Sequence, residues 1–205
     1  MSLSGDLKKL LIKEGATEVG FADLSEYGLK SGISIYMNIP VKSVKKFLSP
    51  SKEYYDVKND FDNKLSEITS KAVEFLKSNG FEAEILSDGE KFSDEYVASR
   101  AGLGWIGKSS RLITSKYGSA VVLATILTDA PLDYGKPVSS SLCGMCRFCT
   151  SNCSNGVISG FLWNPSVGKD DLIDVKNCQN TDSKDKLCGK CIYICPHTQK
   201  YLKKG

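Results

Sequence analysis

The sequence predicts an α+β fold in which an N-terminal α/β-layered domain is followed by a small cysteine-rich module. Three observations support this prediction. Helix and strand patterns alternate through the first part of the chain, all eight cysteines lie between positions 143 and 195, and a linker at 131–141 joins the two regions. We therefore expect two domains, covering residues 1–138 and 139–205.

The first elements follow from the spacing of apolar residues. Residues 4–14 repeat leucine at steps of three and four, which predicts an amphipathic helix that stops at Gly15. Alternating apolar and polar residues then predict strands at 17–24 and 32–39. A short helix over 41–48 follows the second strand.

The longest predicted helix covers 56–79, again because apolar side chains recur at steps of three and four. A strand at 81–86 follows, and this strand–helix–strand order favours helices packed on a sheet. Ser93 is expected to cap the next short helix. Further on, we expect a hairpin between strands at 111–114 and 119–128.

The cysteines fall in two runs with short, regular steps. The first run is Cys143-x2-Cys146-x2-Cys149-x3-Cys153, and the second is Cys178 followed by Cys188-x2-Cys191-x3-Cys195. A 4Fe–4S cluster takes four thiolates, so eight cysteines suit two clusters in a ferredoxin-like module. In two-cluster ferredoxins the last cysteine of a run faces the other cluster. The predicted ligand sets are therefore Cys143, Cys146, Cys149 and Cys195 for one cluster, and Cys153, Cys178, Cys188 and Cys191 for the other.

A disulfide framework and zinc are alternative uses of these cysteines. A disulfide framework also needs an even count, but it is typical of small secreted domains. Zinc sites use pairs of C-x2-C, which leaves the third cysteine of the first run without a place. We also expect Trp163 to shield a cluster from water and so tune its potential.

A glycine-rich segment at 101–110 precedes the cysteines. Its glycines, lysine and serines would let backbone amides and an ammonium group approach a ligand closely. It matches neither the dinucleotide-binding nor the P-loop pattern. A tight turn around a buried tryptophan explains the same residues equally well. The candidate cofactor-binding residues are Gly102, Gly104, Trp105, Gly107, Lys108 and Ser109.

The composition limits the environment and the partners. The 27 Lys and Arg against 24 Asp and Glu give a net charge of +3, which is too mild to indicate a nucleic-acid partner. No apolar run suits a membrane span, and the N-terminus does not suit a signal peptide. We expect a cytoplasmic protein without a membrane partner, in an anaerobic host that preserves exposed clusters. His197 is expected at a solvated helix start and not as a ligand.

With these motifs in view, the chain resembles the epoxyqueuosine reductase family, a set of cobalamin-dependent iron–sulfur enzymes related to reductive dehalogenases. The resemblance covers about residues 85–197 and rests on the cysteine runs and three short segments. These segments are RAGLGWIGK at 100–108, YGS at 117–119 and ILTDAPL at 126–132.

The resemblance implies a cobalamin bound between the α/β domain and the cluster module, with electrons reaching it through the clusters. It also implies a catalytic proton donor at Asp88, which lies thirteen residues before Ala101. A turn explains this aspartate equally well, because Ser87-Asp88-Gly89 is favourable turn sequence.

Members of the family that act on tRNA continue past the clusters into helical repeats, whereas this chain ends ten residues after Cys195. We therefore expect a shortened member that lacks these repeats and does not act on tRNA. The first functional hypothesis is a cobalamin-dependent reductase of an unknown small-molecule substrate, supplied by an electron donor such as a ferredoxin, flavodoxin or reductase. The alternative is a ferredoxin-like electron-transfer protein without cobalamin that docks a partner redox enzyme.

Overall fold

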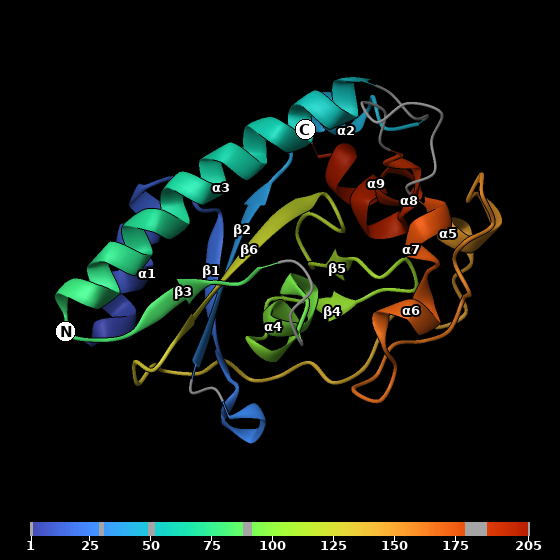
Figure 1. Ribbon diagram of the computed structural model, residues 1–205. Helices are drawn as coiled ribbons and strands as arrows, with labels where there is room; N and C mark the ends of the chain where they lie inside the picture. Colours follow the sequence, from blue (N-terminus) through green and yellow to red (C-terminus); the bar gives the residue numbers. More distant parts are fainter. Residues whose placement is uncertain (1, 29–30, 49–51, 88–91, 179–187, 205) are drawn as a thin grey trace. The chain divides into compact units, whose positions relative to one another are not determined.

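The structure is a computed structural model that describes residues 2–28, 31–48, 52–87, 92–178 and 188–204 (Figure 1). The chain forms two compact units, each built from three separate segments. The first unit contains Met1–Met37, Phe61–Leu103 and Val122–Val138. The second contains Asn38–Asp60, Gly104–Val121 and Ser139–Gly205. Two segments that the sequence assigned to the N-terminal domain are thus grouped with the cysteines.

A four-stranded sheet with the order β1-β2-β6-β3 organises the first unit. Its strands are β1 (Glu18–Asp23), β2 (Ser31–Asn38), β3 (Ala83–Ile85) and β6 (Val121–Thr128). β1 and β2 are antiparallel, with Phe21 opposite Ile33, and β3 and β6 are antiparallel, with Ile85 opposite Ile126. Because side chains alternate along a strand, the apolar residues of the central strands gather on one face.

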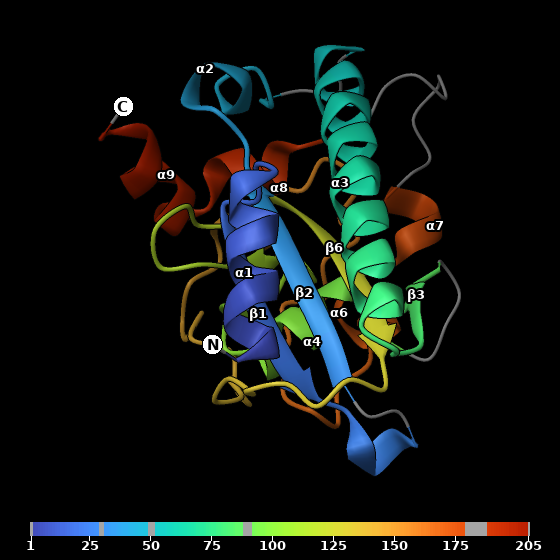
Figure 2. The same ribbon diagram turned by 90° about the vertical axis from the view of Figure 1, so that its left-hand side faces the viewer.

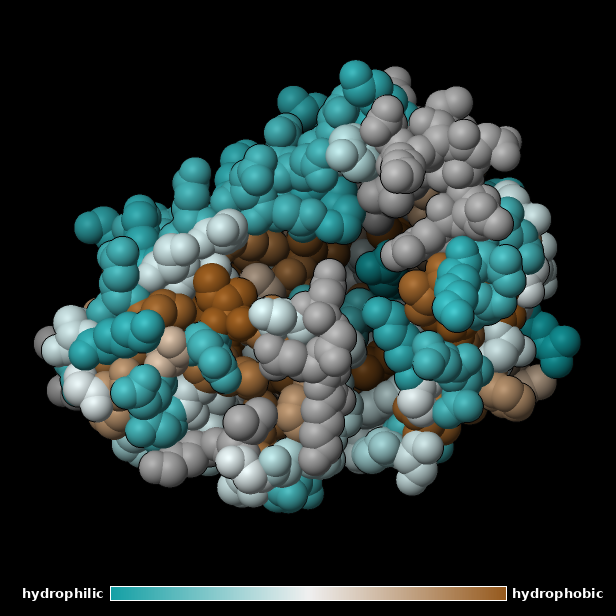
Figure 3. All heavy atoms as spheres, viewed as in Figure 1, coloured by the Kyte–Doolittle hydropathy of each residue, from teal (hydrophilic) through white to brown (hydrophobic). Residues whose placement is uncertain are grey.

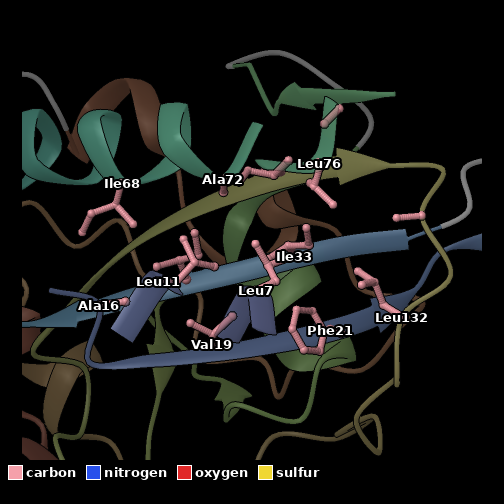
Figure 4. Close-up of a cluster of buried hydrophobic side chains, with 14 of the residues drawn as sticks. Leu7, Leu11, Ala16, Val19, Phe21, Ile33, Ile68, Ala72, Leu76 and Leu132 are labelled. Carbon is pink, nitrogen blue, oxygen red and sulfur yellow. The ribbon is translucent and has the colours of Figure 1, made fainter. Parts of the chain in front are cut away.

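Two helices, α1 (Leu3–Lys13) and α3 (Lys52–Ser78), pack on that face and lie in front of the sheet in Figure 2. Between them and the strands lies a closed apolar core that includes Leu11, Ile33 and Ala72 (Figure 4). The outer surface along α3 is hydrophilic (Figure 3). This one-sided pattern is the amphipathicity that predicted both helices.

A third helix, α4 (Asp94–Arg100), packs on the opposite face of the sheet through Val97. Gly32 makes room for it, because a Cβ at that position would lie 2.6 Å from the Val97 side chain. Ser93 caps the helix as predicted, since its Oγ accepts a hydrogen bond from Tyr96 N at 3.2 Å. A 3-10 turn, η1 (Ser25–Tyr27), follows β1.

The second unit consists of short elements. They are α2 (Val41–Val44), β4 (Trp105–Ile106), β5 (Leu112–Ile113), α5 (Phe148–Ser151), α6 (Lys169–Leu172), α7 (Val175–Cys178), α8 (Lys190–Ile194) and α9 (Pro196–Leu202). β4 and β5 form an antiparallel hairpin in which Trp105 lies opposite Ile113. The cysteines lie on α5, α7 and α8 and in the loops beside them.

The mixed α/β class is confirmed, but one strand pairing is wrong. The predicted hairpin between 111–114 and 119–128 does not form, because β5 pairs with β4 and β6 pairs with β3. The segment between them closes on itself through a bridge of Thr114 with Gly118. The apolar pattern identified both strands, but it carries no information about which distant strand completes each ladder.

Candidate metal centre

Five cysteines line a cavity of about 100 Å³ in the second unit, namely Cys143, Cys146, Cys149, Cys191 and Cys195. Cys143 and Cys146 share a turn that is closed by a hydrogen bond of 3.0 Å from Cys146 N to Cys143 O. Cys149 follows on α5, and Cys195 joins α8 to α9. Three thiols therefore come from one short turn of chain, and the others arrive from the second run.

The charge environment of Cys149 identifies its neighbours. Its pKa is raised to about 11, first by burial and then by the negative charges of Cys143, Cys146 and Cys195. Burial also raises the pKa of Cys195, and Cys143 adds to that rise. A bound metal cluster offsets such repulsion, because metal coordination deprotonates and neutralises the thiols.

A second group consists of Cys153, Cys178 and Cys188 together with Cys191, which also lines the first cavity. Burial raises the pKa of Cys191 to about 12, and Cys178 and Cys188 contribute to this rise. Burial likewise raises the pKa of Cys178, to which Cys153 and Cys188 contribute. In both cases Arg111 opposes the rise, because its positive charge favours the thiolate. These are the four thiols that the spacing predicts for the second cluster.

All eight cysteines are free thiols in the structure. Within the described part of the chain, no group of three or more His, Cys, Asp or Glu side chains is placed to hold a metal ion. The two ligand sets, and the choice of iron–sulfur clusters over zinc, therefore stay predictions.

Lys108, a candidate cofactor residue, lies beside the first thiol group. It sits between β4 and β5, its side chain is 7% exposed, and it lines the same cavity as Ser109 and the cysteines. Its Nζ donates hydrogen bonds to the carbonyl oxygens of Gly144 and Cys146, each at 2.9 Å. Lys108 thus fixes the cysteine loop, a contact between distant segments that local sequence patterns do not reveal.

The candidate glycines are enclosed by the chain itself. A Cβ on Gly104 would lie 2.4 Å from Ile113 O, and one on Gly107 would lie 2.5 Å from Ile113 Cδ1. Gly102, in the first unit, has a φ of +80°, and a Cβ there would lie 2.7 Å from Lys136 O. These close approaches explain the glycines structurally, and cofactor binding by this segment stays a prediction.

Trp105 and His197 pack together in the second unit. Trp105 is buried, and its ring meets the imidazole edge to face, with the ring centroids 4.9 Å apart. His197 lies at the start of α9, as predicted, but its imidazole is only partly exposed, because it packs against Trp105 and lines the cavity. Burial, and then the charge of Lys200, lower the pKa of His197. Trp163 is also buried, and its shielding role stays a prediction.

One predicted site residue has no described position, and one residue without a predicted role lies near the thiols. Asp88, the predicted proton donor, lies outside the described residues, so its role stays a prediction. Arg111 was given no site role by the sequence, yet it is a charged neighbour of Cys178 and Cys191. The sequence did offer a signal for Arg111, because it is a second cation three residues after Lys108 in a chain with a cysteine-rich module.

The curated relatives of the chain are epoxyqueuosine reductases, while no protein-family model matches it. The enzyme of Listeria monocytogenes is 34% identical over 119 residues, which cover 55% of this chain and 31% of that protein. The enzyme of Prochlorococcus marinus is 28% identical over 190 residues, which cover 85% of this chain and 59% of that protein. The chain therefore spans less than two thirds of the length of either relative.

Solved structures share the fold. An epoxyqueuosine reductase bound to an epoxyqueuosine-modified tRNA-Tyr stem loop has a TM-score of 0.68 at 22% identity, over 96% of this chain and 65% of that one. The catabolic reductive dehalogenase NpRdhA has a TM-score of 0.77 at 18% identity, and the match covers 94% of this chain and 31% of that one. The fold is thus that of the epoxyqueuosine reductases and reductive dehalogenases. In sequence, the chain is similar to the epoxyqueuosine reductases, in agreement with the resemblance.

These findings overturn the prediction that tRNA is not a partner. The related enzyme solved with a tRNA stem loop matches 96% of this chain in fold, so the matched region is part of an RNA-binding protein. A mild net charge does not exclude an RNA partner, because RNA binding depends on where charges lie and not on their sum. In the described residues, no helix combines the length and apolarity needed to cross a membrane.

Proposed function

We propose that the chain is an iron–sulfur oxidoreductase that holds two 4Fe–4S clusters and uses a corrinoid for reduction. The observation that carries this proposal is the grouping of the eight thiols into two adjoining sets. Cys149 has Cys143, Cys146 and Cys195 as charged neighbours, and it is itself a charged neighbour of Cys191. Adjoining clusters suit electron transfer, because electrons step efficiently only over short gaps.

Several residues of the second unit would support the clusters. Lys108 ties the loop that carries Cys146, and the tight turn of α8 into α9 positions Cys195. Buried apolar groups such as Trp163 would exclude water, which tunes cluster potentials. When bound, the clusters supply one-electron transfer and a corrinoid supplies a strongly reducing metal centre.

Support for the corrinoid comes from the family and from one unpaired donor. A reductive dehalogenase described as B12-dependent has a TM-score of 0.74 at 17% identity. In this chain the buried Trp105 Nε1 has no hydrogen-bond partner among the described residues. A buried N–H without a partner is costly, so a polar group of a bound ligand is a fitting acceptor.

The proposal is tested anaerobically by reconstituting the clusters and then titrating cob(II)alamin. We expect about eight irons per chain, since each cubane carries four. We also expect the EPR signal of cobalt to change on binding, which marks a corrinoid in a protein pocket. An iron content near zero contradicts the cluster assignment. Full iron with an unchanged cobalt signal leaves the electron-transfer protein without cobalamin as the function.

The substrate class is tested with an epoxyqueuosine-modified tRNA stem loop, the ligand of the related enzyme. Formation of queuosine by the reconstituted protein, followed by mass spectrometry of the nucleosides, identifies a tRNA reductase. Corrinoid binding without this product points to a reductase with another substrate.

We propose Asp88 as the proton donor of the reaction, since a carboxyl in a protein site can serve as a general acid. In a structure of the epoxyqueuosine reductase from Bacillus subtilis, a catalytic loop that carries an aspartate is swung out of the active site (TM-score 0.67, 21% identity). We expect Asp88→Asn to lower turnover by about 10²-fold or more while iron content and corrinoid binding stay normal. Glu84→Gln, on the exposed side of β3, is the control and should keep wild-type turnover. Equal activity of Asp88→Asn and wild type excludes this role.

A further inference from the structure

Lys108 is a buried cation with neutral partners. The residue is 7% exposed, and among the described residues its ammonium group donates to the carbonyl oxygens of Gly144 and Cys146. Within the part of the chain that the structure describes, no carboxylate forms a salt bridge with it. Burying a charge without a counter-charge is strongly unfavourable. The group that supplies the counter-charge should therefore lie where this side chain points.

The side chain lines the cavity that holds Cys143, Cys146, Cys149 and Cys195, the first thiol group, and that Cys191 of the second group also lines. A cubane with four thiolates carries net negative charge, which is the counter-charge that Lys108 lacks. Its two hydrogen bonds to the cysteine loop hold the ammonium group in place. Because the site is buried, water screens this interaction only weakly.

Lys108 lies in the turn that joins β4 to β5, and the backbone of this turn holds the residue in position. Gly107 N donates to Arg111 O at 2.9 Å, and Ser110 N donates to Gly107 O at 2.9 Å. Ser110 has a φ of +54°, a left-handed conformation that is costly for a residue with a Cβ. The same turn presents Arg111 to the other thiol group, but Arg111 is exposed to water. This turn thus supplies one cation to each group of thiols. Lys108, beside the first group, is buried, and Arg111, beside the second, is exposed.

We propose that Lys108 is a positioning residue that raises the reduction potential of the cluster held by Cys143, Cys146, Cys149 and Cys195. This inference rests on the proposed function. Reduction adds a negative charge to the cluster, and a nearby buried cation stabilises the reduced state more than the oxidised state. Arg111 acts in the same direction on the second cluster, and more weakly because water screens its charge.

The test is a redox titration of reconstituted protein followed by EPR, with iron counted in every sample. Lys108→Gln keeps a hydrogen-bond donor but removes the charge, and Lys108→Arg keeps the charge. We expect Lys108→Gln to lower the equilibrium constant for reducing one cluster by about tenfold, which is about 59 mV for a one-electron couple. Lys108→Arg should stay near wild type. Arg111→Gln is the matched control. It should lower the reduction potential of the other cluster, and by a smaller amount.

The outcomes separate this inference from the proposed function. If wild-type protein assembles no clusters, the proposed function fails together with the inference. If Lys108→Gln carries full iron and an unchanged potential, only the inference is overturned. Loss of iron in both Lys108 variants marks a purely structural lysine and also overturns it. If Lys108→Gln loses iron while Lys108→Arg keeps full iron and a normal potential, the result supports the proposal, because the cluster then requires the positive charge at this position.

Discussion

Cys195→Ala is expected to abolish the cluster of Cys143, Cys146 and Cys149 and to spare the cluster of the run in which Cys195 itself lies. The reason is the crossed arrangement, in which Cys195 lines the cavity of the first thiol group and is a charged neighbour of Cys149. Iron should fall from about eight to about four per chain. Alkylation followed by mass spectrometry should then find Cys143, Cys146 and Cys149 newly reactive, because thiols released from a cluster react freely.

The reciprocal variant and a loop control complete this experiment. Cys153→Ala should also halve the iron, but it should expose Cys178, Cys188 and Cys191 to alkylation. Met145→Ala lies in the cysteine loop with a side chain that is 90% exposed, so it should keep all the iron. If Cys195→Ala instead exposes Cys188 and Cys191, each run holds its own cluster and the crossed assignment is wrong.

Gly118→Ala is expected to cause a large loss of stability. Gly118 has a φ of +60°, and a Cβ there would lie 2.2 Å from the backbone nitrogen of Thr198. This backbone is further fixed, because Thr198 Oγ1 accepts a hydrogen bond from Ser119 N at 3.0 Å. The left-handed conformation and the overlap together should cost roughly 2–5 kcal/mol in the free energy of unfolding. Urea unfolding of the reconstituted protein, followed by circular dichroism, measures this loss.

Gly156→Ala is the matched control. Gly156 has a similar φ of +64°, but nothing lies within 4 Å of the Cβ that alanine would add. Gly156→Ala should lower the free energy of unfolding by only about 1–2 kcal/mol, which is the cost of the left-handed conformation without any overlap. Gly118→Ala should also lose iron more readily, because Thr198 lies on α9, which begins directly after Cys195. Equal losses of stability in the two variants contradict the close approach of Gly118 to α9.

Local patterns in the sequence determined most of the first unit and the grouping of thiols within each run. The leucines of α1 and the apolar spacing of α3 identify the buried faces, because a helix places residues three and four apart on one side. Likewise, a C-x2-C-x2-C turn brings Cys143, Cys146 and Cys149 together by its local geometry. Such information resides within a few residues of chain and needs no distant partner.

Only the tertiary structure decided which distant segments meet. It pairs β5 with β4 in place of β6, packs His197 against Trp105, and directs Lys108 to the carbonyl oxygens of the cysteine loop. Lys108 and Cys146 are 38 positions apart, and no periodicity links them. Their contact exists because burial of apolar surface selects one arrangement of the whole unit, and the polar groups left inside must then find partners. The residue that we expect to tune the cluster was therefore visible in the sequence only as part of a glycine-rich segment.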